Sequence, residues 1–118
     1  MLDKTTLNAT APDTAILGPL GNSCIRHMHF RHAGDCMEGH AHAVDHGTLI
    51  TAGGIRLRQW RDTDAPQDRE IVAPALVNIP AGTMHQLTAL VDGTDCWCVF
   101  IVRDEDGGVA NALPLSAF

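Results

Sequence analysis

Four histidines are the residues of this chain whose type and spacing predict chemistry. His40, His42 and His46 lie at alternating positions within the segment 39–46. In an extended strand, residues i, i+2 and i+6 share one face, so these three imidazoles are expected to converge. His85 follows the turn-like segment Pro-Ala-Gly-Thr-Met and is expected to approach from a neighbouring strand. Because imidazole nitrogen is the commonest protein ligand of divalent transition metals, the four histidines predict a metal site inside a β-fold.

The strands that must position these histidines follow from the residue pattern. No segment of ten or more residues shows helical periodicity, and short apolar runs alternate with Gly and Pro turns. This pattern predicts an all-β sandwich or barrel, with residues 1–20 as an N-terminal arm and 21–118 as the β-barrel domain. Ile16–Leu17 is expected to form a short edge pairing, and Gly53–Gly54 and Asp92–Gly93 each predict a tight hairpin. The expected strands are 23–32, 39–46 with its continuation 48–52, 55–60, 70–72, 75–79, 85–91 and 95–102.

Composition restricts the class of protein. With 118 residues, 45% of them hydrophobic, the chain is long enough to bury a core without disulfide or metal cross-links. It has no apolar run of the ~20 residues that cross a bilayer, and its first residues do not resemble a signal peptide, so a cytoplasmic location is expected. The net charge of −6 gives no electrostatic support to nucleic-acid binding. We therefore expect a small-molecule ligand or substrate as the partner, and neither nucleic acid nor membrane.

The four cysteines do not suggest a disulfide framework. They form no C-x-x-C pair, and a cytosolic protein keeps its thiols reduced. Cys96 and Cys98 flank Trp97 on an expected strand, so the two thiols share one face. Two interpretations stay open for this pair. The cysteines are either small buried apolar residues or thiols placed beside the metal.

The histidine segment also contains a family motif. The first motif of the cupin superfamily is written G-x5-H-x-H-x3/4-E-x6-G. In this chain the same spacings separate Gly34, His40, His42, His46 and Gly53. The one departure is His46, which stands in the position of the glutamate. The chain resembles the cupin superfamily in this segment.

The second cupin motif is written G-x5-P-x-G-x2-H-x3-N. Its core is matched by Pro80, Gly82 and His85, while Pro74 stands in the position of the first glycine and Ala89 in that of the asparagine. The two motifs together span residues 34 to 89. A match to both motifs is strong evidence for a fold and weak evidence for a reaction, because one fold carries many functions.

The resemblance implies a single-domain cupin jelly-roll β-barrel, commonly a homodimer, with one divalent transition metal (Fe, Mn, Ni, Cu or Zn) in the barrel mouth. It assigns His40, His42 and His85 as metal ligands. His46, in place of the usual carboxylate, either coordinates as a fourth imidazole or withdraws and leaves a three-histidine site. Asp45 is a less favoured ligand, because its parity points it to the other face of the strand.

Replacing glutamate by histidine in such a site removes one negative charge from around the metal. The metal then becomes a stronger Lewis acid, and anionic ligands bind more readily. Four histidines on an octahedral metal leave two positions for a substrate, whereas four histidines on tetrahedral zinc close the coordination shell. Coordination number therefore separates a catalytic site from a structural one.

An acid or base beside the metal is harder to identify. Glu38 and Gln86 are weak catalytic candidates, and His27, His29 and Arg58 are others; each is expected more often to be structural or exposed. The chain has no tyrosine and few aromatic residues, which favours a small aliphatic pocket over a stacking cage.

Three functions remain open at this point. The first is a metal-dependent cupin enzyme that acts on a small, oxygen-rich, anionic metabolite, by dioxygenase-like or isomerase/lyase-like chemistry at a mononuclear histidine site. The second is a non-catalytic cupin that binds a small molecule. The third is a domain whose metal is closed and structural.

Overall fold

The chain folds into two antiparallel β-sheets that face each other. The computed structural model describes residues 10–41 and 45–101, without the side chains of Pro19 and His40. These residues contain no helix, and hence none that could cross a membrane. The strands are β1 (Asp13–Leu20), β2 (Ser23–Phe30), β3 (Cys36–His40), β4 (His46–Ala52), β5 (Gly54–Trp60), β6 (Gln67–Val72), β7 (Ala75–Ile79), β8 (Met84–Ala89) and β9 (Thr94–Ile101).

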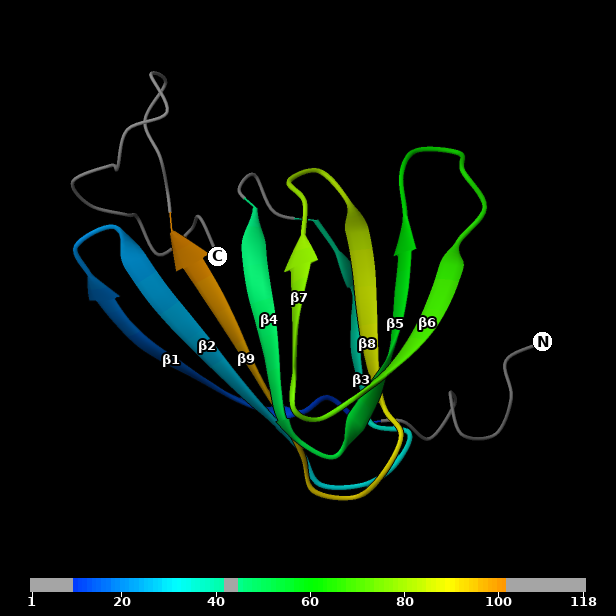
Figure 1. Ribbon diagram of the computed structural model, residues 1–118, viewed down its shortest axis with the longest axis horizontal. Helices are drawn as coiled ribbons and strands as arrows, with labels where there is room; N and C mark the ends of the chain where they lie inside the picture. Colours follow the sequence, from blue (N-terminus) through cyan, green and yellow to red (C-terminus); the bar gives the residue numbers. More distant parts are fainter. Residues whose placement is uncertain (1–9, 42–44, 102–118) are drawn as a thin grey trace.

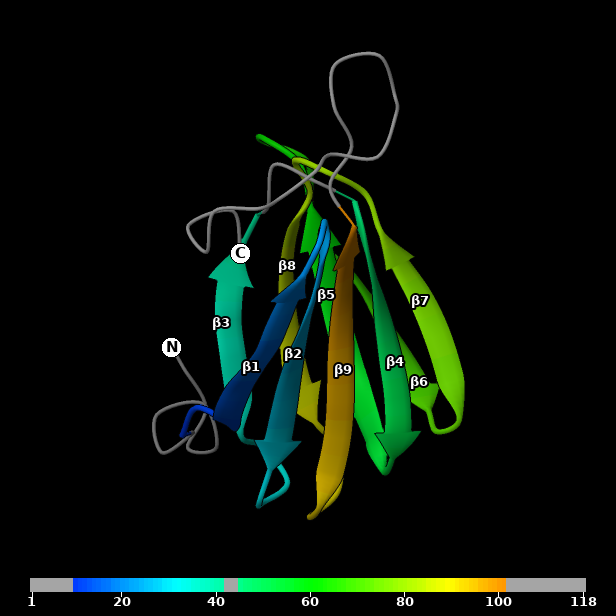
Figure 2. The ribbon, with the colours of Figure 1, turned by 90° about the vertical axis from the view of Figure 1, so that its left-hand side faces the viewer.

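The strand order is that of a jelly roll. The five-stranded sheet has the order β1-β2-β9-β4-β7, and the four-stranded sheet has the order β3-β8-β5-β6. Figure 1 shows the two sheets diverging upward from a common base, and Figure 2 shows the five-stranded sheet in front of the other. The prediction of an all-β jelly roll is confirmed. The hydrogen-bond ladders do not continue from one sheet to the other, so the barrel is formed by two opposed sheets.

The core lies between the sheets and follows the alternation of each strand. In β9, Thr94, Cys96, Cys98 and Phe100 are buried, while the residues between them face outward. The opposite sheet contributes inward-facing side chains from β5 and β8 by the same period of two. Each large apolar side chain removed from water in this way stabilises the fold by about 1.5–3 kcal/mol. The largest buried apolar side chains are Phe30, Phe100, Met28, Ile50, Ile55, Leu57, Ile79 and Leu87.

Both predicted hairpins are wrong. Gly53 and Gly93 do form turns with positive φ, of 74° and 72°. However, β4 and β5 belong to different sheets, and so do β8 and β9, so each turn carries the chain across the core. A glycine turn specifies only a local reversal of the backbone. Which strand the next segment pairs with is decided by where its apolar face becomes buried, and the local pattern does not contain that information.

The N-terminal edge of the five-stranded sheet is longer than expected. The edge pairing expected at Ile16–Leu17 is present, with Ile16 opposite Arg26 and Leu17 opposite Ile25. It extends through the whole of β1, so the expected arm is a strand of the sheet from Asp13 onward. The first nine residues and those after Ile101 lie outside the described residues.

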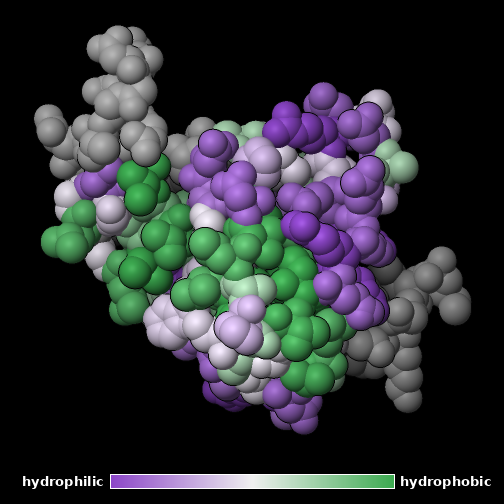
Figure 3. Space-filling model, in the orientation of Figure 1, coloured by the Kyte–Doolittle hydropathy of each residue, from purple (hydrophilic) through white to green (hydrophobic). Residues whose placement is uncertain are grey.

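The surface is divided between apolar and polar regions. Leu76 and Val72 are 71% and 69% exposed, and Leu49 is partly exposed on β4. Figure 3 shows the apolar surface over β4 and β7 and the polar surface on the side of β5 and β6. β6 is almost entirely exposed and carries Gln67, Asp68, Arg69 and Glu70, so its polarity agrees with its position at the sheet edge.

A buried carboxylate joins the start of the described chain to the turn before β3. Thr10 Oγ1 donates to Asp35 Oδ1 at 2.8 Å, and the backbone N–H of His32 donates to Asp35 Oδ2 at 3.1 Å. Burial by itself raises the pKa of Asp35, but these hydrogen bonds favour the carboxylate and bring its pKa below the usual value. The backbone N–H of Cys36 also donates to the Thr10 carbonyl at 2.9 Å, so both chain segments are held together here.

We expect Asp35→Ala to destabilise the protein by about 1–3 kcal/mol at neutral pH, because two donors lose their acceptor. Since the pKa of Asp35 is lower in the folded state, its stabilisation is present above the unfolded-state pKa and disappears as pH falls through the folded-state pKa. Urea unfolding of both proteins at pH 7 and at pH 3 measures this. A difference between them that stays constant down to pH 3 would contradict the assignment.

Candidate metal centre

Two of the four predicted metal ligands meet in the interior between the sheets. His46 is the first residue of β4 in the five-stranded sheet, and His85 lies on β8 in the four-stranded sheet. Their side chains are 3% and 1% exposed. The two ring centres are 5.1 Å apart, with an angle of 50° between the ring planes. The structure therefore brings these two imidazoles together from opposite sides of the fold.

The prediction of a single strand through His40, His42 and His46 is wrong. β3 ends at His40, and β4 begins at His46 in the other sheet. His46 is thus directed into the interior from β4, and not from the strand of His40 as parity predicts. His46 nevertheless meets His85, because β4 and β8 face each other across the interior.

The backbone places His40 beside His85. The two residues are opposite each other in the antiparallel pair β3–β8, after a register shift that follows Met37. His42 lies outside the described residues, as does the side chain of His40. Among the side chains that the structure describes, no group of three or more His, Cys, Asp or Glu residues is placed to hold a metal ion. Metal binding by the four histidines thus stays a prediction.

The imidazole of His85 is oriented by a hydrogen bond to the backbone. His85 Nδ1 lies 3.1 Å from the Thr83 carbonyl oxygen. Because a carbonyl oxygen only accepts, the proton must be on Nδ1, and the lone pair of the neutral ring is then on Nε2. Metal-binding histidines typically have such a partner on the other ring nitrogen.

The spacing of the two rings fits a shared metal. With metal–nitrogen bonds of about 2.1 Å and about 90–109° between ligands, two imidazole centres lie about 4.6–5.3 Å apart. The observed 5.1 Å falls within this range. The donor set and its spacing therefore fit a transition-metal ion, as the residue types predict.

The turn that leads to His85 is held by side chains from two other segments. Asp45 accepts a hydrogen bond from the backbone N–H of Ala81 at 2.5 Å. Arg61 donates to Thr83 Oγ1 at 3.0 Å and to the Ala81 carbonyl at 3.3 Å. Asp45 is exposed and directed to this turn, so its role here is to support the turn.

Phe100 forms the wall behind His46. Its ring is fully buried and stacks on the His46 imidazole, with the centres 4.7 Å apart and the planes at 26°. The pair follows from the sheet register, in which His46 and Phe100 are opposite each other on β4 and β9. This contact restricts the orientations open to the His46 ring.

We expect His46→Glu to keep the fold and the metal, because glutamate is the residue of the cupin motif at this position. Without metal, the variant should be less stable than the metal-free wild type by about 1–2 kcal/mol, since a carboxylate is then buried beside Phe100 without a bound metal ion. Urea unfolding with and without EDTA, combined with metal analysis, measures both effects. A folded variant that has lost the metal would contradict the expectation that glutamate can replace the imidazole at this position.

The two inward-facing cysteines of β9 behave as buried apolar residues. Burial raises the pKa of the Cys96 thiol to about 12 and also raises the pKa of Cys98. Both thiols therefore stay protonated at neutral pH. Cys98 Sγ lies 3.5 Å from the Thr48 hydroxyl within the core. The structure favours the first of the two interpretations of this pair.

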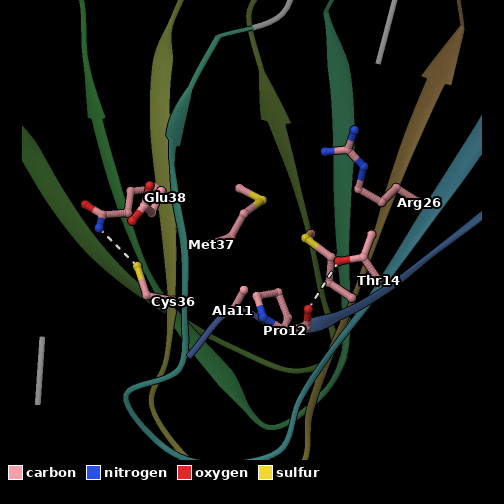
Figure 4. A pocket seen from close by; sticks show the side chains of 9 residues that line it. Ala11, Pro12, Thr14, Arg26, Cys36, Met37 and Glu38 are labelled. Carbon is pink, nitrogen blue, oxygen red and sulfur yellow. Dashed lines mark hydrogen bonds between the residues drawn. The ribbon is translucent and has the colours of Figure 1, made fainter. Parts of the chain in front are cut away.

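A cavity of about 390 Å³ opens between the edges of the two sheets. It is lined by residues of β1, β2, β3 and β8, among them Arg26, Met28, Met37, Glu38 and Gln86. Figure 4 shows Arg26 reaching from β2 into the space between the sheets, with Met37 facing it from β3. Its size is within the range of small-molecule sites.

The two weak catalytic candidates lie at the outer margin of this cavity. The side-chain amide of Gln86 donates to Cys36 Sγ at 3.0 Å. Figure 4 shows Cys36 and Glu38 on the side of β3 away from Arg26. Gln86 alternates with the inward-facing residues His85 and Leu87, so it faces away from the histidine pair. Neither candidate is placed beside His46 and His85.

The other candidate groups lie on outer faces of the sheets. His27 Nε2 and His29 Nδ1 lie 2.9 and 2.8 Å from the same Asp95 oxygen, Oδ1. His27 also stacks on Trp97, with ring centres 4.0 Å apart. Arg58 makes two hydrogen bonds to Asp68, at 2.7 and 2.9 Å, which raise the pKa of Arg58. These residues are part of the surface, as expected for most of them.

Arg26 was not predicted as a site residue. On β2, Arg26 lies an even number of positions from the core residues Cys24, Met28 and Phe30, so it lies on their inward-facing side. The sequence does contain a signal for an inward-facing charge, because Arg26 interrupts a strand face that otherwise consists of Cys, Met and Phe. That signal could not be used, because both faces of this strand carry plausible core residues.

The sequence matches no family model and no curated protein. Its structure is similar to solved structures of several proteins. KdgF from Halomonas sp. is 17% identical, with a TM-score of 0.64 over 79% of this chain and 80% of that protein. A cupin domain from Bordetella pertussis Tohama I is 11% identical, with a TM-score of 0.62 over 82% of this chain and 98% of the other.

The oxalate decarboxylase of Bacillus subtilis is a longer protein with the same fold. It is 15% identical, with a TM-score of 0.70 over 92% of this chain, and this chain covers 28% of its length. Similarity at these sequence identities concerns the fold and not the activity. A protein described as a cysteine peptidase, peruvianin-I of Thevetia peruviana, is also among the similar structures. Together with the strand order and the two motifs, these structures show that the chain has the cupin fold.

Proposed function

We propose that the chain is a metal-dependent cupin enzyme that acts on a small, oxygen-rich, anionic metabolite. The observation that carries the proposal is the meeting of His46 and His85, from facing sheets, with ring centres 5.1 Å apart in a buried interior. The fold also contains a small cavity lined by Arg26, and Arg26 contacts the same Phe100 ring on which His46 stacks. A pair of imidazoles buried in the interior of a fold that also contains a small-molecule-sized cavity supports a ligand-binding metal.

His40, His42, His46 and His85 would hold the metal. The metal would supply Lewis-acid polarisation of a bound oxygen atom, and the absence of a carboxylate among its ligands would strengthen this effect. The backbone carbonyl of Thr83 sets the tautomer of His85, and Phe100 sets the plane of His46. Among the similar structures, oxalate decarboxylase by its name acts on a small dicarboxylate, which supports the substrate class proposed here.

The test is metal analysis together with X-ray absorption on protein purified without a His-tag or chelator. We expect about one equivalent of a five- or six-coordinate metal with several imidazole ligands. Four-coordinate zinc without an exchangeable water would instead support a closed structural site. A protein that takes up no metal, even when it is offered in excess, would refute the proposal.

A further inference from the structure

Arg26 lines the cavity and has no role in the proposed metal site. Arg26 is half-buried on the inward face of β2, between the buried residues Cys24 and Met28. Its guanidinium carbon is 5.8 Å from the centre of the Phe100 ring. A cation in this position has been moved partly out of water, which costs free energy unless an anion or acceptor compensates it.

The described part of the chain offers Arg26 little compensation. Arg31, Arg56 and Arg58 each have a carboxylate within 4.0 Å on the surface. The Nε of Arg26, by contrast, is buried and has no hydrogen-bond partner among the described residues. A buried donor left in this state destabilises the fold. The carboxylate that also lines the cavity, Glu38, lies on the other side of β3 (Figure 4).

Packing against Phe100 does not account for this arrangement. A cation–π contact at this distance does not engage the N–H donors in the guanidinium plane. Those donors form a fork that matches two oxygen atoms of one carboxylate. The cavity that Arg26 lines has space for a small molecule, and Met28 and Met37 give it flexible apolar walls.

We infer that Arg26 binds the carboxylate of the ligand and selects small aliphatic carboxylic acids. Phe100 contacts both Arg26 and His46, so the carboxylate subsite and the histidine pair share one aromatic neighbour on β9. The inference names a residue and a substrate class for the site of the proposed function, and rests on that function for the role of the metal. Carboxylate binding itself requires only Arg26 and the cavity.

Isothermal titration with malonate, succinate and glycolate tests the inference, with neutral malonamide as a control ligand. Wild-type protein is titrated both metal-free after EDTA treatment and reloaded with Mn²⁺. We expect the acids to bind and malonamide not to bind. Arg26→Gln should weaken binding of the acids about 10- to 100-fold, since a charge-assisted hydrogen bond contributes about 1.5–3 kcal/mol.

Arg56→Gln is the matched control. It removes the same charge from an exposed arginine that pairs with Glu70 at 4.0 Å, and should leave the affinities unchanged. Arg26→Lys keeps the charge without the fork, and should recover part of the binding. It also replaces Arg26→Gln in the comparison if the glutamine variant does not fold, as judged by urea unfolding.

The outcomes separate this inference from the proposed function. If Arg26→Gln, or Arg26→Lys in its place, binds the acids as tightly as wild type, the inference is wrong even where the metal is bound. If neither form of the wild type binds any of the acids, it is also wrong. If the protein takes up no metal but its carboxylate binding depends on Arg26, the inference stands and the proposed function fails.

Discussion

Replacing His85 by alanine is expected to abolish stoichiometric metal binding. His85 is 1% exposed, its proton is held on Nδ1 by the Thr83 carbonyl, and its ring centre lies 5.1 Å from that of His46. Loss of a ligand should weaken metal binding by more than the 10- to 100-fold effect of losing a supporting hydrogen bond. Metal content after dialysis and titration of the metal-free protein with Mn²⁺ or Zn²⁺ measure the effect.

His27→Ala provides the control for this experiment. His27 lies on the outer face of the five-stranded sheet, where it contacts Asp95 and Trp97. The variant removes an imidazole without changing the interior, so it should retain full metal content. If His85→Ala binds metal with the stoichiometry and affinity of His27→Ala, the proposed centre is wrong.

Gly53→Ala is expected to give the largest loss of stability among single-methyl changes at the glycine turns. Gly53 has φ of 74°, a conformation that costs an alanine about 1–2 kcal/mol. A Cβ at this position would also clash with Thr94 Oγ1 and lie 3.0 Å from the Thr94 Cα. The Thr94 hydroxyl is itself buried and lies 2.9 Å from the Val91 carbonyl and 3.2 Å from that of Gly54, so it has little freedom to move. Overpacking adds about 1–3 kcal/mol, and we expect a total of about 2–5 kcal/mol in urea unfolding.

Gly93→Ala isolates the steric part of this loss. Gly93 has nearly the same φ, 72°, but a Cβ there would have no neighbour within 4 Å. It should therefore cost only the conformational part, about 1–2 kcal/mol. Equal losses in the two variants would show that the contact with Thr94 does not constrain the corner between β4 and β5.

The residue pattern was sufficient to predict most strands and the fold class. The bounds of β2, β5, β7 and β9 agree with the expected segments to within two residues, because alternation and glycine or proline turns act over a few residues. The spacing of two motifs, which span residues 34 to 89, also predicted the cupin fold that the similar structures show.

Residue type and motif position also indicated that His46 and His85 belong to one site. His46 and His85 were expected to converge, and they do. The path was wrong, because the chain leaves the four-stranded sheet after His40 and enters the other sheet at His46.

The sequence by itself determined the residue types, their strand periodicity and the turns. Only the tertiary structure decided which sheet each strand joins. It therefore also decided that the turns at Gly53 and Gly93 connect the two sheets and that His46 lies opposite His85. It also decided which face of β2 is buried, and so placed Arg26 in the cavity and His27 on the surface. The physical reason is that periodicity defines two faces of a strand, while burial against a distant strand selects one of them.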